Sequence, residues 1–144
     1  MFMYQITERL FVGNIYETAQ PPAQIGALLM VAEEYDVEMP RWLATGRIPL
    51  KEYGKADARQ LADAVAWIER HVKESRVLVC CRAGMGRSVS VVMAYLCCIE
   101  GMSYADIVQL IMIRRPGAMP LPQLEEAIQT VKRLRQADQG HPPA

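Results

Sequence analysis

The stretch that decides the fold reads Arg76-Val77-Leu78-Val79-Cys80-Cys81-Arg82-Ala83-Gly84-Met85-Gly86-Arg87-Ser88. Its β-branched and apolar beginning, residues 77–80, predicts a central strand that is buried on both faces. The glycines that follow permit a tight turn, and residues 88–100 are apolar almost all round, which predicts a buried helix ending at Gly101. The chain is therefore expected to pass from a buried strand through a short loop into a buried helix.

Three further segments in the first half of the chain predict short strands. Residues 10–13 and 27–31 are apolar between polar or glycine-containing flanks. Residues 47–50 form another short run, and Pro49 places that strand near an edge of the sheet because proline cannot donate to a ladder. The acidic stretch over residues 33–38 is expected to be a solvated loop.

The second half of the chain predicts mainly helices. Apolar residues recur at helical spacing after Asp57, which is placed to cap that helix. Ser103-x-x-Asp106 resembles a capping box, and the last helix is expected to begin near Pro122. We therefore expect an α/β domain in which a central, mostly parallel sheet is flanked by helices, with a loop between the central strand and the buried helix.

Length and charge limit the classes of function. A chain of 144 residues suits one domain, expected over residues 1–138, with a disordered tail over residues 139–144. Lys plus Arg and Asp plus Glu number 16 each, so no net charge attracts nucleic acid or an anionic membrane. Neither a signal peptide nor a membrane-spanning segment is recognisable. We expect a cytoplasmic monomer.

The cysteines and histidines argue against a metal site. The four cysteines form two adjacent pairs, Cys80 with Cys81 and Cys97 with Cys98, which is neither a metal-binding spacing nor the pattern of a disulfide scaffold. Of only two histidines, His141 lies in the expected tail. Zinc enzymes and histidine-based triads are therefore unexpected, and we predict no metal and no cofactor.

The segment from Cys81 to Ser88 combines the groups that one mechanism requires. Its glycines let successive N–H groups point inward, and the following helix directs its positive end to the same place. Such a cradle binds a tetrahedral dianion, and the planar fork of Arg87 can bind two of its oxygens. Cys81 begins this positive concavity, where a thiolate is favoured and becomes a nucleophile. The loop is thus predicted to bind phosphate and to attack phosphorus.

Other interpretations of the same loop explain fewer of its residues. A purely structural glycine-rich turn leaves the combination of nucleophile, glycines and arginine to chance. A nucleotide-binding P-loop requires lysine where Arg87 stands, and its glycine spacing differs. Sulfur transfer of the rhodanese type would use Cys81 but gives Arg87 no role.

The pattern Cys-x5-Arg-Ser after a buried strand resembles the signature loop of the cysteine-based protein tyrosine phosphatases. The order of four further segments resembles that in small dual-specificity phosphatases. These segments are Leu10-Phe11-Val12-Gly13-Asn14, Ile48-Pro49-Leu50, Val77-Leu78-Val79 and Arg115-Pro116-Gly117-Ala118. The likeness covers about residues 4–135. It implies hydrolysis of phosphotyrosine, and of phosphoserine and phosphothreonine if the pocket is shallow, through a phosphocysteine on Cys81.

The resemblance also implies the roles of individual residues. Cys81 would attack phosphorus, Arg87 would bind the phosphoryl oxygens through the transition state, and Ser88 would ease departure of the thiolate. The residues expected to bind the phosphate group are Arg82, Ala83, Gly84, Met85, Gly86 and Arg87. The family usually has an aspartate shortly after the Ile-Pro strand as general acid, and Glu52 is the best match here. Asp57 is the other candidate, although its position favours the helix cap.

Two features leave alternative functions open. Cys80 stands where the family has a histidine that orders the loop, so a weakly active or purely phosphate-binding relative is one alternative. Cys80 itself is expected to be a small buried core residue, and a disulfide with Cys81 would strain the backbone. Arg82 adds a positive charge of the kind found in inositol phosphate and phosphoinositide phosphatases, whereas Met85 does not. We therefore prefer phosphorylated proteins as substrates over these alternatives.

Overall fold

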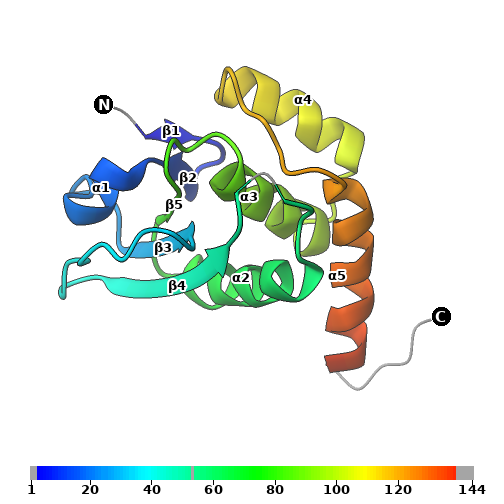
Figure 1. Cartoon of the computed structure of the whole chain (residues 1–144), viewed down its shortest axis with the longest axis horizontal. Helices are drawn as coiled ribbons and strands as arrows, with labels where there is room; N and C mark the ends of the chain where they lie inside the picture. The colour runs from blue at the N-terminus through cyan, green and yellow to red at the C-terminus, as the bar shows by residue number, and fades with distance from the viewer. Residues whose placement is uncertain (1–2, 53, 139–144) are drawn as a thin grey trace.

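The computed structural model describes residues 3–52 and 54–138 (Figure 1). The disordered tail expected at residues 139–144 lies outside this part of the chain. In chain order the elements are β1 (Tyr4–Gln5), β2 (Leu10–Gly13), α1 (Ile15–Ala19), β3 (Ala27–Ala32), β4 (Ala44–Leu50), α2 (Ala58–His71), β5 (Val77–Cys80), α3 (Arg87–Cys98), α4 (Tyr104–Arg114) and α5 (Leu124–Asp138).

The sheet has five strands in the order β1-β2-β5-β3-β4. Strand β5 lies in the middle and runs parallel to β2 and to β3, β3 runs parallel to β4, and only β1 is antiparallel to its neighbour β2. The expected α/β fold with a central, mostly parallel sheet is confirmed. So is the edge position of the strand with Pro49, although β4 begins at Ala44 and is longer than predicted.

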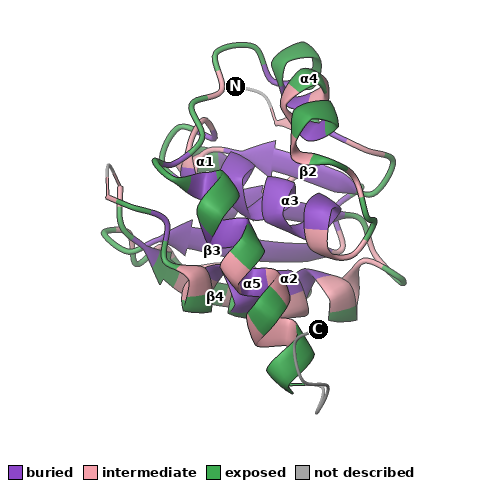
Figure 2. Ribbon diagram, turned by 90° about the vertical axis from the view of Figure 1, so that its right-hand side faces the viewer, coloured by how far each residue is buried: buried purple, intermediate pink, exposed green. Residues whose placement is uncertain are grey.

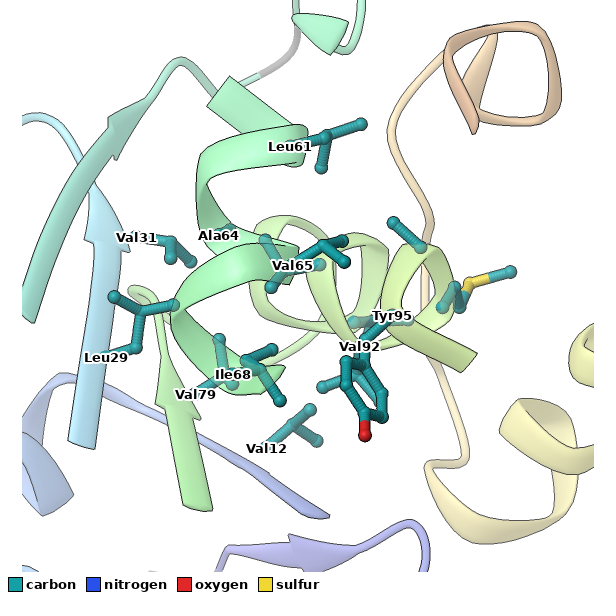
Figure 3. Packing of buried hydrophobic residues seen from close by; sticks show 14 of the residues in the cluster. Val12, Leu29, Val31, Leu61, Ala64, Val65, Ile68, Val79, Val92 and Tyr95 are labelled. Carbon is teal, nitrogen blue, oxygen red and sulfur yellow. The ribbon is translucent and has the colours of Figure 1, made fainter. Parts of the chain in front are cut away.

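The central strands are buried on both faces because helices cover the sheet. All residues of β3 and β5 are buried, which explains their unbroken apolar sequences. Figure 3 shows Leu29 and Val79 of the sheet near Val65 and Ile68 of α2 and Val92 of α3, all fully buried. Burial of each such side chain contributes roughly 1.5–3 kcal/mol to folding.

Helix α3 occupies the interior between the sheet and the outer helices. Figure 2 shows it buried over most of its length, whereas α4 and α5 each keep an exposed side. The sequence of α3 is apolar all round because the helix is buried, as predicted. Gly101 follows this helix with φ of 71°, the left-handed conformation expected at a glycine end.

Two predicted helix starts agree with the structure, whereas α5 begins at Leu124, so Pro122 lies two residues before the helix rather than in its first turn. The side chain of Asp57 accepts a hydrogen bond from the backbone N–H of Gln60 at the start of α2. Ser103 accepts in the same way from Asp106 at the start of α4. No helix within the described ranges is both long enough and apolar enough to cross a membrane.

Candidate active site

The segment between β5 and α3, residues 81–87 and called here the 81–87 loop, lies against the end of β2. The backbone N–H of Cys81 donates to the carbonyl of Gly13 at 3.2 Å, and the carbonyl of Arg82 accepts from the N–H of Ile15 at 3.2 Å. Gly84 has φ of 69°, and a Cβ atom there would lie 2.8 Å from the Gly13 carbonyl oxygen. The close approach and the left-handed conformation together require glycine at this position.

The backbone carbonyls of residues 82–86 accept hydrogen bonds, whereas the amide groups of residues 82–87 are left unpaired within the described part of the chain. The carbonyl of Met85 accepts from the N–H of Met119 at 2.8 Å, and that of Gly86 accepts from the N–H and the hydroxyl of Ser90, each at 2.8 Å. None of the amide groups of residues 82–87 donates a hydrogen bond to another group in the described part of the chain. A row of unpaired N–H donors at the start of a helix is an anion-binding arrangement.

Cys81 and Ser88 lie together at the base of this loop. Their Sγ and Oγ atoms are 3.2 Å apart, and both residues are buried. The serine hydroxyl can therefore donate a hydrogen bond to a thiolate on Cys81.

Arg87 is held in one orientation by groups from two other segments. Its side chain is only 2% exposed, and its Nη1 and Nη2 atoms lie 2.5 and 2.7 Å from the two carboxylate oxygens of Glu34. Nη1 also donates to the carbonyl of Leu50 at 3.2 Å. These contacts use three of the five guanidinium hydrogens, and the Nε hydrogen and one Nη2 hydrogen form the remaining fork. That fork can bind two oxygens of a phosphoryl group.

Glu34 is a site residue that the sequence analysis missed. The stretch over residues 33–38 is a loop as predicted, but Glu34 is not simply solvated, because it pairs with the buried Arg87. Hydrogen bonding from Arg87 holds the pKa of Glu34 below its ordinary value of 4.5. Arg47 of β4 fixes the same loop by donating to the carbonyls of Tyr35 and Val37.

The two candidate acids occupy different places. Glu52 lines the pocket in front of the 81–87 loop, and its Oε2 is 3.7 Å from Nη2 of Arg87. Asp57 caps α2, as predicted, and lies in a separate hollow with Pro49 and Lys51. The geometry brings Glu52, and not Asp57, to the 81–87 loop.

The pocket in front of the loop has a volume of about 530 Å³. Its far side comes from the segment between α4 and α5, which runs past the start of α3 (Figure 1). Arg82 and Arg87 are the cationic side chains that line it, and Glu52 is the acidic one. The other lining residues are Cys81, Ala83, Met85, Gly86, Met119, Pro120, Leu121 and Pro122. The walls above the polar base are therefore mainly apolar.

The remaining thiols lie in the core or pack against it. Cys80 is fully buried beside the side chain of Thr18, and burial raises the pKa of its thiol to about 12. Burial likewise raises the pKa of Cys98 in α3 to about 11. Cys80 and Cys81 are both free thiols, as expected from the strain of a bond between neighbours. Within residues 3–52 and 54–138 no cluster of three or more His, Cys, Asp or Glu side chains could hold a metal ion.

Comparison with known proteins identifies the family. The family model "Dual specificity phosphatase, catalytic domain" matches residues 21–136. A comparison with curated protein sequences found no significant match. Human DUSP28 has a similar structure, with a TM-score of 0.79 and 23% identity over 94% of this chain and 99% of that chain.

Two other solved structures support the same fold. Tk-PTP in the active form gives a TM-score of 0.77 and 22% identity over 90% of this chain and 95% of that chain. A mouse putative dual specificity phosphatase complexed with zinc tungstate gives a TM-score of 0.77 and 24% identity over 99% of this chain and 93% of that chain. With the family match spanning most of its length, the chain belongs to the dual specificity phosphatase family and is a cysteine-dependent protein phosphatase.

Proposed function

We propose that the protein hydrolyses phosphotyrosine in phosphorylated proteins through a phosphocysteine intermediate on Cys81, with phosphoserine and phosphothreonine as further substrates. The observation that carries the proposal is the row of amide groups over residues 82–87, next to Cys81, that donate no hydrogen bond within the described part of the chain. The catalytic domain would comprise residues 1–138. We further propose that it acts as a monomer, and in the cytoplasm, where its free cysteines would stay reduced.

The first chemical step would transfer the phosphoryl group to sulfur. The Cys81 thiolate attacks phosphorus, the S–P bond forms, and the bond from phosphorus to the leaving oxygen breaks. The amide groups of residues 82–87 and the free fork of Arg87 stabilise the charge on the equatorial oxygens. Glu52 donates a proton to the leaving oxygen, so that an alcohol or phenol departs. The nearness of Glu52 to Arg87 supports this role for its carboxyl group.

The second step would hydrolyse the phosphocysteine. Water attacks phosphorus, and Glu52, now a carboxylate, accepts a proton from it. The S–P bond breaks and the electron pair returns to sulfur as a thiolate. A hydrogen bond from Ser88 would stabilise this thiolate, which the 3.2 Å distance between Sγ and Oγ permits.

The lining of the pocket favours an aromatic phosphoester. The apolar side chains of Met85, Met119 and Leu121 offer contact area to a phenyl ring above the phosphate. Inositol phosphates present several anionic groups, but the cations lining the pocket are Arg82 and Arg87, which are too few to pair with several phosphates. Phosphotyrosine therefore suits the site better than a polyphosphorylated sugar alcohol.

Trapping the intermediate tests the proposal directly. We expect an acid-quenched reaction with an aryl phosphate to show protein mass increased by one phosphoryl group, located on the peptide containing Cys81. Cys81→Ser should abolish turnover yet keep vanadate binding measurable, because the amide cradle does not depend on sulfur. Substantial turnover by Cys81→Ser would contradict the covalent mechanism, and wild-type phosphate binding without turnover would make the protein a binding relative.

A further inference from the structure

Arg115, the residue after α4, is buried behind the 81–87 loop, with only 9% of its surface exposed. Its Nε donates to the carbonyl of Gly84 at 2.8 Å, and its Nη2 donates to the carbonyl of Ala83 at 3.2 Å. Its Nη1 donates to the carbonyl of Pro116 at 2.5 Å. One side of the guanidinium fork therefore holds two consecutive carbonyl groups of the loop.

The ring of Tyr4 covers a face of the same guanidinium. The Cζ atom of Arg115 lies 4.1 Å from the centre of the Tyr4 ring, a cation–π distance. Tyr4 belongs to β1, which Figure 1 shows beside the loop after β5, and it pairs with Val12 of β2. Arg115 is thus held by the 81–87 loop through its N–H groups and covered by a residue of the N-terminal strand.

We propose that Arg115 is a positioning residue that sets the direction of the peptide groups from which the loop binds phosphate. The C=O and N–H of one peptide group point in opposite directions because the group is planar and trans. When Arg115 holds the carbonyls of Ala83 and Gly84 outside the loop, the N–H groups of Gly84 and Met85 must face inward. The inference rests on the proposed function, since it assumes that phosphate binds inside the loop.

These two peptide groups are held by a side chain, whereas the others are held by backbone N–H groups of other segments or by the first turn of α3. The carbonyls of Arg82 and Met85 accept from backbone N–H groups, and that of Gly86 accepts from the first turn of α3. Gly84 adopts a conformation that only glycine enters freely, so its flanking peptide groups meet little steric resistance to rotation. A rotated peptide would direct a carbonyl oxygen at the phosphate, where its negative end repels the anion. Arg115 opposes that rotation.

The test compares Arg115→Met, which removes the fork, with Arg115→Lys, which can reach one carbonyl. We expect the dissociation constant for inorganic phosphate to rise by about ten- to a hundredfold in Arg115→Met, the equivalent of one charged hydrogen bond, and by less in Arg115→Lys. Tyr4→Leu removes the aromatic ring that covers the guanidinium and should weaken phosphate binding by a few-fold. Tyr4→Phe keeps a ring there and should bind phosphate as the wild type does.

A second measurement separates positioning from stability. Iodoacetate is an anion and iodoacetamide is neutral, so the ratio of their rates of alkylating Cys81 reports whether the anion cradle is formed. We expect this ratio to fall in Arg115→Met. The matched control is Arg135→Met on α5, where a partly buried arginine pairs with Glu69 at 2.8 Å away from the pocket. That variant should lose stability and keep both the ratio and the affinity for phosphate.

The outcomes are distinguishable from failure of the proposed function. If the wild type binds phosphate and turns over, and Arg115→Met or Arg115→Lys binds phosphate as tightly with an unchanged alkylation ratio, the positioning role is refuted while the function stands. If the wild type neither binds phosphate nor turns over, the function itself is refuted. Should Arg115→Met not fold, Arg115→Lys and Tyr4→Leu decide by the same two measurements.

Discussion

Glu34→Gln tests whether a carboxylate outside the loop keeps Arg87 in its working orientation. The variant keeps the shape of the side chain but replaces a charged acceptor of two hydrogen bonds with a neutral group that accepts with one oxygen. Arg87 is 2% exposed, and the side chain of Glu34 is 37% exposed. Breaking a fully buried pair costs about 3–5 kcal/mol and an exposed one about 0–1, so solvent screening at Glu34 leaves about 1–2 kcal/mol.

Urea unfolding as a function of pH measures this contribution. The pKa of Glu34 is lower in the folded protein than its ordinary value of 4.5. A depressed carboxyl pKa stabilises the fold at pH above the unfolded value, and the stabilisation is lost as pH falls through the folded value. The difference in unfolding free energy between wild type and Glu34→Gln should therefore be largest above about pH 4.5 and should shrink at lower pH. At neutral pH, kcat/KM for an aryl phosphate should fall about tenfold because Arg87 is less well oriented.

Glu33→Gln is the matched control for this experiment. Glu33 is the preceding acidic residue and is exposed, and no ion pair of its side chain occurs in the described part of the chain. We expect that variant to match the wild type in unfolding free energy and in kcat/KM. Equal behaviour of Glu34→Gln and Glu33→Gln in both assays would refute the role of Glu34.

Four further variants test the loop, its neighbouring thiol and the acid. Gly84→Ala should cost about 1–2 kcal/mol of unfolding free energy from its left-handed conformation alone, more from the contact with Gly13, and should weaken phosphate binding; normal binding would contradict the packing. Cys80→Ala should keep turnover within about twofold and cost about 1–2 kcal/mol of stability, since the thiol is a core group. Glu52→Gln should slow esters with basic leaving oxygens most, whereas Asp57→Ala should lower stability by about 1 kcal/mol; a leaving-group effect only in Asp57→Ala would reverse these roles.

The fold could be predicted because its strongest signals are local. The strand at residues 77–80 and the apolar helix after it are both central elements. Their burial can be predicted from their apolar composition alone. The elements that were missed, β1 with two residues and α1 with five, are too short to show a periodicity. Asn14 and Glu17 do form a capping box at α1, which was the available signal for that helix.

The site could be predicted where its residues share one loop and, for Glu52, where the family resemblance indicated the position. Cys81, Arg87 and Ser88 share one loop, and the residue types there indicate one chemistry. Glu34 contacts Arg87 from 53 positions away, and Arg115 contacts Gly84 from 31 positions away. One general rule could have suggested Glu34: it follows β3, and the carboxyl ends of parallel neighbours such as β3 and β5 meet at one edge of the sheet. No comparable rule connects the residue after α4 with two carbonyl groups of the loop.

These long-range contacts explain why a loop rich in glycine can hold a fixed shape. Glycine permits the inward turn of the amide groups but does not enforce it, because a flexible peptide pays a larger entropy cost to adopt one conformation. The enforcement comes from elsewhere in the chain: the start of α1 holds the carbonyl of Arg82, Arg115 holds the next two, and the segment before α5 holds that of Met85. An isolated peptide of residues 76–88 has the same nucleophile and the same arginine, yet none of these partners. Its affinity for phosphate should therefore be far below that of the folded domain. In the folded domain the loop is already ordered, so phosphate binding does not bear the entropy cost of ordering it.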